Sequence, residues 1–266
     1  MISDFGSSGF RIWVLAFAVT IAGCGPKTPT LPPGSADADK FLFDRGTEAA
    51  KEKKWLNARE YFRNLVDNYP QSPFRPDAKL ALGDTYIGED TTESLLLAAN
   101  EFREFLTFYP TSPRADYAQY RLAFAQSEQM LAPERDQTNT REAIKELQVF
   151  VDRYPNSPIL PDARALMRKA KDRLSEASYR VGFFYFRSKW WPGAIDRFQQ
   201  VLKEDPEFTQ RDAVYYHLAE SLLRIDRKAE ALPYFERLLK EFEQSSYLEA
   251  SRRRVSELKS APVPER

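Results

Sequence analysis

The phrase Tyr-Pro-x-Ser-Pro occurs three times in this chain, at residues 69–73, 109–113 and 154–158. Regular spacing of 40 and then 45 residues is typical of a helical repeat array. The first proline cannot continue a helix, and it disfavours helical geometry in the residue before it. The serine and second proline suit the N-cap and first position of the next helix. The phrase therefore predicts a recurring stop, turn and start between helices.

A longer pattern of small and apolar residues accompanies the phrase in five copies. A small residue is followed by Ala, an aromatic residue or Leu four positions later, an apolar residue three later and, in four copies, Pro five later. The sets are Gly46, Ala58, Phe62, Leu65, Pro70; Gly83, Ala98, Phe102, Phe105, Pro110; Ala123, Ala143, Leu147, Phe150, Pro155; Gly182, Ala194, Phe198, Val201, Pro206; and Ala219, Ala231, Phe235, Leu238. Small residues let paired helices approach closely, and we expect the aromatic residues to fill the space between pairs.

The distance from the small residue to Ala is 12 in three copies and 15 and 20 in the second and third. We interpret the two longer values as loop insertions in the polar stretches 88–94 and 132–140. The pattern, with Leu82, Gly83 and Tyr86, resembles the tetratricopeptide repeat. Residues 162–189 contain one glycine and no proline, which predicts one helix of about 40 Å. The expected fold is an all-α tetratricopeptide-repeat solenoid of about five helix pairs, with this long helix joining two halves and 248–259 as a capping helix.

The N-terminus has the pattern of a secretion signal. An apolar run at 12–22 follows Arg11 and ends in Ala22-Gly23-Cys24, which resembles the lipobox of bacterial lipoproteins. Cys24 is the only cysteine, so it cannot form an internal disulfide, and we expect it to be lipidated. The proline-rich stretch that follows would act as an extended tether. The expected organisation is signal peptide 1–23, lipidated tether 24–39, N-terminal repeats 40–175, C-terminal repeats and cap 176–260, and a disordered tail 261–266.

Local motifs then connect the chain to a known family. Residues 134–137 (Glu-Arg-Asp-Gln), 151–157 (Val-Asp-Arg-Tyr-Pro-Asn-Ser), 162–164 (Asp-Ala-Arg) and 172–174 (Asp-Arg-Leu) resemble the BamD family of outer-membrane β-barrel assembly lipoproteins. The resemblance implies an anchor in the outer membrane, on the periplasmic face. It implies as partners unfolded outer-membrane protein precursors, accessory assembly lipoproteins and a BamA-like barrel-forming subunit, which docks through a POTRA domain.

Five residues are candidates for these contacts. The resemblance places a POTRA-docking arginine in the second helix of the fourth repeat, where this chain has Arg197. First-helix residues line the concave face of such arrays, which makes Arg45, Glu48, Glu52 and Asp84 candidates for binding precursors. Arg197 is also compatible with an ordinary solvated helix charge. A second hypothesis is a lipid-anchored repeat scaffold for another envelope client, such as a secretin pilotin or a division coordinator.

The composition and motifs favour binding over catalysis. Lys plus Arg and Asp plus Glu both number 39, so no net charge favours nucleic acid as a partner. His217 is the only histidine, and one histidine without spare cysteines does not make a zinc site. Gly-x-Ser-x-Gly and glycine-rich phosphate loops are absent from the sequence. We therefore expect no enzyme activity, no cofactor and no metal, and a packed or helix-capping role for His217.

Overall fold

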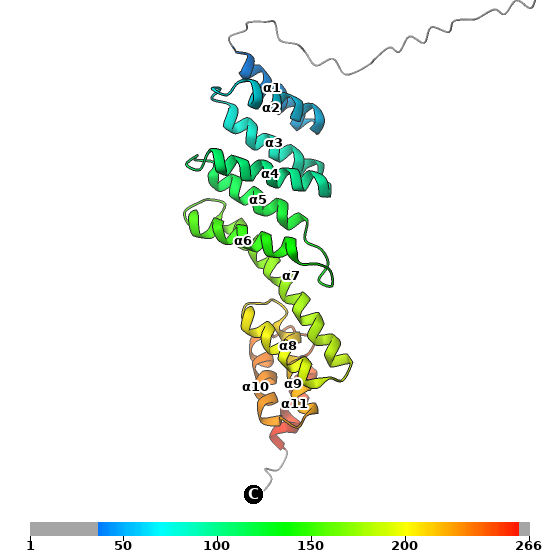
Figure 1. The fold of residues 1–266 in the computed structure, drawn as a ribbon. Helices are drawn as coiled ribbons and strands as arrows, with labels where there is room; N and C mark the ends of the chain where they lie inside the picture. Colours follow the sequence, from blue (N-terminus) through cyan, green and yellow to red (C-terminus); the bar gives the residue numbers. More distant parts are fainter. Residues whose placement is uncertain (1–36, 261–266) are drawn as a thin grey trace, which may run out of the picture. The chain divides into compact units, whose positions relative to one another are not determined.

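Eleven α-helices make up the part of the chain that this computed structural model describes, residues 37–260, and no strand occurs within it (Figure 1). They are α1 (Ala38–Lys51), α2 (Trp55–Asn68), α3 (Arg75–Glu89), α4 (Thr92–Phe108), α5 (Ala115–Glu128), α6 (Thr138–Arg153), α7 (Leu160–Arg187), α8 (Trp191–Glu204), α9 (Arg211–Arg224), α10 (Lys228–Glu241) and α11 (Leu248–Ser260). The chain divides into two units, Met1–Ala38 and Asp39–Arg266. The predicted signal peptide, Cys24, most of the tether and the tail 261–266 lie outside the described residues.

The helices form five successive pairs, α1/α2 to α9/α10, and α11 follows the last pair, as the sequence pattern predicts. The small residue of each pair has the expected packing role. A Cβ atom added to Gly46, Gly83 or Gly182 would lie 2.6, 2.6 or 2.8 Å from the ring of the aromatic residue in the paired helix. Those aromatic residues, Phe62, Phe102 and Phe198, are almost completely buried. The close approach at the small residue therefore fixes how each pair packs.

The repeated phrase ends helices as predicted, but its serine does not begin the next one. Tyr69, Tyr109 and Tyr154 follow directly on α2, α4 and α6. The next helices begin three residues after the serine, and their N-cap residues make no side-chain capping bond. Instead the serine oxygen accepts a hydrogen bond from the amide two residues ahead, at 3.1 Å in each copy. The prediction of a serine N-cap was therefore wrong.

The serine hydroxyl has a long-range partner that explains this difference. Ser72 donates to Asp39 of α1, and Ser157 donates to Asp116 of α5, both at 2.6 Å. Each aspartate lies in the first turn of the first helix of its pair, so the bond ties that helix to the turn after the second helix. Ser245 and Asp212 repeat the contact at 2.6 Å in the last pair. In its first and third copies the phrase thus closes its own pair rather than opening the next.

The two predicted insertions have different structures. In the second pair only Asp90 and Thr91 separate the helices, and the extra residues lengthen α4 to 17 residues. A capping box between Thr91 and Ser94 begins α4, so residues 88–94 hold the end of α3, a two-residue turn and the start of α4, and the prediction of a loop insertion there was wrong. In the third pair the extra residues form an irregular segment, 129–137, between α5 and α6, in agreement with the prediction.

The predicted long helix is confirmed as α7, which has 28 residues. Its first half packs against α6, where Ala163 and Met167 join Leu147 and Phe150 in one apolar cluster. Its second half pairs with α8 through Gly182. One helix therefore serves two successive pairs, and α6 and α8 contact different parts of it. Among the described residues, no helix has the length and apolar character that crossing a membrane requires.

Candidate functional site

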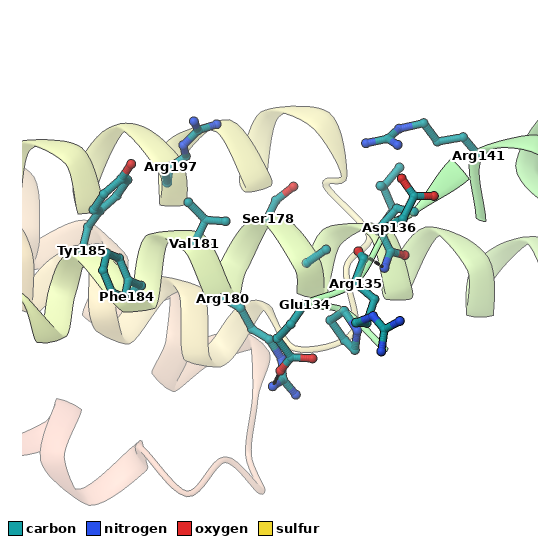
Figure 2. A pocket seen from close by; sticks show the side chains of 14 residues that line it. Glu134, Arg135, Asp136, Arg141, Ser178, Arg180, Val181, Phe184, Tyr185 and Arg197 are labelled. Atoms are coloured by element: carbon teal, nitrogen blue, oxygen red, sulfur yellow. Dashed lines mark hydrogen bonds and ion pairs between the residues drawn. The ribbon is translucent and has the colours of Figure 1, made fainter. Parts of the chain in front are cut away.

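A groove of about 620 Å³ lies where the segment between α5 and α6 approaches the second half of α7 (Figure 2). One wall comes from residues 133–137 and Arg141, and the floor comes from α7. Arg197 of α8 completes the lining. The groove therefore joins the third and fourth repeats, and it contains the arginine that the family resemblance singled out.

The wall of the groove is built by the motif at residues 134–137. The Gln137 amide donates to the carbonyl oxygens of Ala132 and Arg135, at 2.9 and 3.0 Å, and accepts from the Thr140 hydroxyl at 2.8 Å. The Asp136 carboxylate accepts from the Thr138 amide at 2.9 Å. These bonds fold the segment back on itself. From the sequence, this motif indicated only a family likeness. The contacts show that it also shapes the loop.

Two arginines of α7 hold this segment against the long helix. Arg173 donates to the carbonyl oxygen of Leu131 at 3.2 Å. Arg180 forms ion pairs with Glu134 of the segment and with Glu176 of α7. Both partners of the first pair are about half exposed, so we expect that pair to position the segment more than to stabilise the fold.

Positive charge exceeds negative charge in the lining of the groove. Four arginines, at positions 135, 141, 180 and 197, face two acids, Glu134 and Asp136. Hydrogen bonds from Thr138, with a smaller contribution from Arg141, lower the pKa of the Asp136 carboxyl. Within residues 37–260, the guanidinium groups of Arg135, Arg141 and Arg197 make no ion pair; Arg197 donates to the neutral Gln200 amide oxygen at 3.0 Å. Three cationic groups are thus available to an incoming partner.

An apolar strip completes the floor of the groove. Val181 and Phe184 are exposed on α7, and Tyr185 is half-buried beside them (Figure 2). The half-buried Leu174 also lines the groove. An exposed aromatic residue among cations is typical of protein interfaces rather than of small-molecule sites. Among residues 37–260, no group of three or more His, Cys, Asp or Glu side chains is placed to hold a metal ion.

The four precursor-binding candidates lie on two different helices. Arg45, Glu48 and Glu52 are on or just after α1, where Arg45 pairs with Glu48 and Glu52 pairs with Lys54, both at 2.7 Å. These charges are all partly or fully exposed. Their proposed role stays a prediction.

Asp84, on α3, instead contacts α5. Its carboxylate accepts from the Tyr117 hydroxyl at 2.8 Å and pairs with Arg121 at 2.7 Å. Burial raises the pKa of Asp84, although Arg121 opposes the shift, and burial together with Asp84 raises the pKa of Tyr117 to about 12. Asp84 therefore has a structural role in joining the second and third pairs, and its role in precursor binding stays a prediction.

His217 is buried, as the sequence favoured. Its Nδ1 lies 2.7 Å from the carbonyl oxygen of Ala213, and rings from α7, α8, α9 and the segment before α11 surround it. Burial in this aromatic shell lowers the pKa of the imidazole. The histidine is thus a neutral packing element of the C-terminal repeats.

Comparison with known proteins agrees with this architecture. The family model described as "YfiO: Outer membrane lipoprotein" matches residues 35–228, and a tetratricopeptide-repeat model matches residues 213–245. A relative from Caulobacter vibrioides, named "Outer membrane protein assembly factor BamD", is 28% identical over 229 residues, covering 85% of this chain and 73% of its own. A relative of the same name from Haemophilus influenzae is 27% identical over 205 residues, covering 73% and 76%. The chain therefore belongs to the YfiO family of outer membrane lipoproteins.

Proposed function

We propose that this protein is a lipid-anchored scaffold of the outer-membrane β-barrel assembly machinery. It binds unfolded barrel precursors and a POTRA domain of the BamA-like barrel-forming subunit, and it works beside accessory assembly lipoproteins on the periplasmic face. The relatives' role as outer membrane protein assembly factors supports this assignment. The proposed anchor is Cys24, in the lipobox-like sequence.

The observation that carries the proposal is the groove beside Arg197. It combines three arginines without ion pairs and an exposed apolar strip, on a framework that internal hydrogen bonds hold in place. Such a surface supports recognition of a folded protein partner. We assign POTRA docking to this groove and precursor binding to the N-terminal repeats, with Arg45, Glu48, Glu52 and Asp84 as candidate contacts.

The proposed role is binding without catalysis, a cofactor or a bound metal. The polar clusters described above are ion pairs and hydrogen bonds within or between helices and loops, and that of Asp84 with Tyr117 and Arg121 links two helices. The alternative client, a secretin or a division complex, would use the same repeat surfaces. It predicts a different set of proteins bound to the chain in the envelope.

Affinity purification of the tagged full-length protein from detergent-solubilised native membranes tests the proposal. We expect mass spectrometry to identify a POTRA-containing barrel subunit, and we expect Arg197→Glu to reduce its recovery at least tenfold. Arg103→Glu is the matched control, because Arg103 is also exposed on a second helix and also donates to a neutral amide three residues away, at 3.0 Å. Recovery of secretin or division proteins without the barrel subunit would overturn the proposal.

A further inference from the structure

The tight turns that join the two helices of a pair differ in chemistry along the array. Within residues 37–260, four pairs have such a turn with one non-glycine residue at a positive φ, namely Lys53, Asp90, Lys189 and Asp226. The next residue in each turn is the N-cap of the second helix, namely Lys54, Thr91, Trp190 and Arg227. All four N-cap residues are exposed. The turn between α7 and α8 is the one of the four that places an aromatic side chain there, and Trp190 is 55% exposed.

Two tryptophans in succession have different roles in the α7/α8 turn. The ring of Trp190 lies edge-on to Tyr185 of α7, with 4.6 Å between the ring centroids, and packs over Gly193, where an added Cβ atom would lie 2.5 Å from it. Trp191 is half-buried, and its ring lies edge-on to Phe186 at 5.6 Å. Trp191 therefore anchors the turn, while Trp190 is held on one side and presents an aromatic surface to solvent on the other.

Cationic side chains surround these tryptophans. Arg187 and Lys189 are exposed in the turn itself, and neither forms an ion pair with an acid of residues 37–260. The guanidinium of Arg224, at the end of α9, lies 5.8 Å from the centre of the Trp191 ring and is likewise without an ion pair among those residues. Three positive charges thus lie around an exposed indole.

The other tight turns lack this combination. The α3/α4 turn contains Asp90 and no cation. In the α9/α10 turn, Arg227 and Lys228 are paired with acids at 2.6 and 3.2 Å. The α1/α2 turn is cationic at Lys53, but its tryptophan, Trp55, is half-buried against α3. Unpaired cations and an exposed aromatic side chain therefore occur together at the α7/α8 turn.

We propose that the α7/α8 turn, residues 187–191 with Arg224, is a second membrane contact that docks on anionic phospholipid headgroups. An indole has an apolar body and a polar N–H, which suits the boundary between headgroups and acyl chains. Lys and Arg side chains near an anionic leaflet are attracted to its phosphates. The turn also lies at the outer end of α7, where it can reach a flat surface (Figure 1).

The inference takes from the proposed function only the lipid anchor at Cys24, which brings the protein to the membrane. An anchor on a predicted extended tether limits how far the helical body lies from the membrane, but it does not set which side of the body faces the lipid. A second contact at the α7/α8 turn sets that orientation. The chain belongs to a family of outer membrane lipoproteins, so a phospholipid surface is within its reach.

Photocrosslinking in vesicles tests this contact. The lipidated protein, with a benzophenone amino acid at position 190, is reconstituted in phosphatidylcholine vesicles with or without phosphatidylglycerol, and mass spectrometry measures the lipid attached at that position. We expect lipid adducts that increase with phosphatidylglycerol. Position 96 is the matched control, because Leu96 is also 55% exposed but lies on α4, beside the turn that contains no cation. Equal adduct yields from positions 190 and 96, or yields that do not depend on phosphatidylglycerol, would overturn the inference.

Charge substitutions test the part of the cations. Arg187→Gln combined with Lys189→Gln is expected to lower the adduct yield at position 190 by about fivefold or more, because each cation near an anionic surface adds to the attraction. Arg103→Gln combined with Lys145→Gln also removes two exposed cations, from α4 and α6, and is expected to leave the yield unchanged. Equal losses in both double variants would assign the effect to the net charge and contradict docking by the turn.

Crosslinking in cells separates a lipid from a protein as the occupant. We expect position 190 to give phospholipid adducts there as well, and a crosslink to an acidic segment of a protein in their place would refute the inference. A Cys24 without lipid would refute the proposed anchor and this inference together. A lipidated chain without adducts at position 190 would refute this inference alone, because affinity purification of the barrel subunit tests the proposed function separately.

Discussion

The second half of α7 and the helix α9 have the same place in their pairs but opposite surroundings. Position by position, Arg180 corresponds to His217, Val181 to Leu218 and Phe184 to Ser221. All three residues of α9 are buried, and all three residues of α7 are exposed. The repeat register therefore fixes which way a side chain points, whereas the neighbouring helix decides whether that side chain meets protein or solvent.

The difference also explains the residue types at these positions. α9 has Ser221 where a second helix approaches closely, and its hydroxyl donates to the carbonyl oxygen of His217 at 2.6 Å. α7 has Phe184 at the equivalent position, which is the larger side chain on the less crowded face. The Phe184 side chain is 64% exposed, and its ring contact within the described residues is with the neighbouring Tyr185, so packing accounts for little of its size. A binding role, as proposed above, does account for it.

The largest expected effect on stability is at the buried Leu218, whose equivalent in α7 is the exposed Val181. Leu218→Ala removes a fully buried side chain and leaves a cavity, so we expect the free energy of unfolding to fall by about 2–5 kcal/mol. Val181→Ala, at the same register position, is expected to change it by less than about 0.5 kcal/mol, because the side chain is 41% exposed. Urea denaturation of both variants measures the difference. Similar losses for both would show that the two helices do not differ as described.

The pH dependence of stability tests the next equivalent positions, His217 in α9 and Arg180 in α7. His217 is neutral in the folded protein, and burial lowers its pKa from the ordinary 6.5. Its contribution to stability is therefore complete above pH 6.5 and is lost as pH falls below that value towards the folded pKa, by up to about 1.4 kcal/mol per pH unit. Denaturation midpoints measured between pH 7.5 and 5.5 report this slope.

The matched variants separate the histidine from other titrating groups. We expect His217→Phe, which keeps a ring in the aromatic shell but cannot take up a proton, to have a shallower slope over this pH range. Arg180→Gln changes the equivalent exposed position of α7 and should leave the slope unchanged. An unchanged slope in His217→Phe would assign the acid sensitivity to other groups.

The smallest expected effect on stability is at Gly182, where α7 and α8 approach each other closely. Alanine in place of Gly182 would put its Cβ 2.8 Å from the Phe198 ring and 3.2 Å from the Cβ of Arg197. Overpacking costs about 1–3 kcal/mol, and the gain in helix propensity offsets about 1 kcal/mol of it. We therefore expect a net destabilisation of about 1 kcal/mol, measured by thermal or urea unfolding. A stabilised Gly182→Ala protein would mean that the α7/α8 pair adjusts as easily as α9, which has Ala219 at this position.

Several features of the fold were readable from the sequence because their causes act over short distances. Proline ends a helix within one turn, and the spacing from Ala58 to Phe62 places both residues on one helix face. The recurrence of Gly or Ala ahead of an aromatic residue or Leu predicted the pairs, and the lack of proline in residues 162–189 predicted the continuous α7. The candidate Arg197 came from the family resemblance, and the structure places it in the groove.

Other features depended on contacts between residues far apart in the chain. In the first and third copies of the repeated phrase the serine bonds an aspartate 33 or 41 residues earlier, so its local suitability as an N-cap did not decide its role. Phe184 falls at a position that is buried in α3, α5 and α9, yet here no second helix covers it. Sequence determined the helices, their pairing and their register, because these follow from local sterics and periodicity. Tertiary structure decided which face of α7 stays open, because burial depends on the neighbours that the fold brings beside a residue.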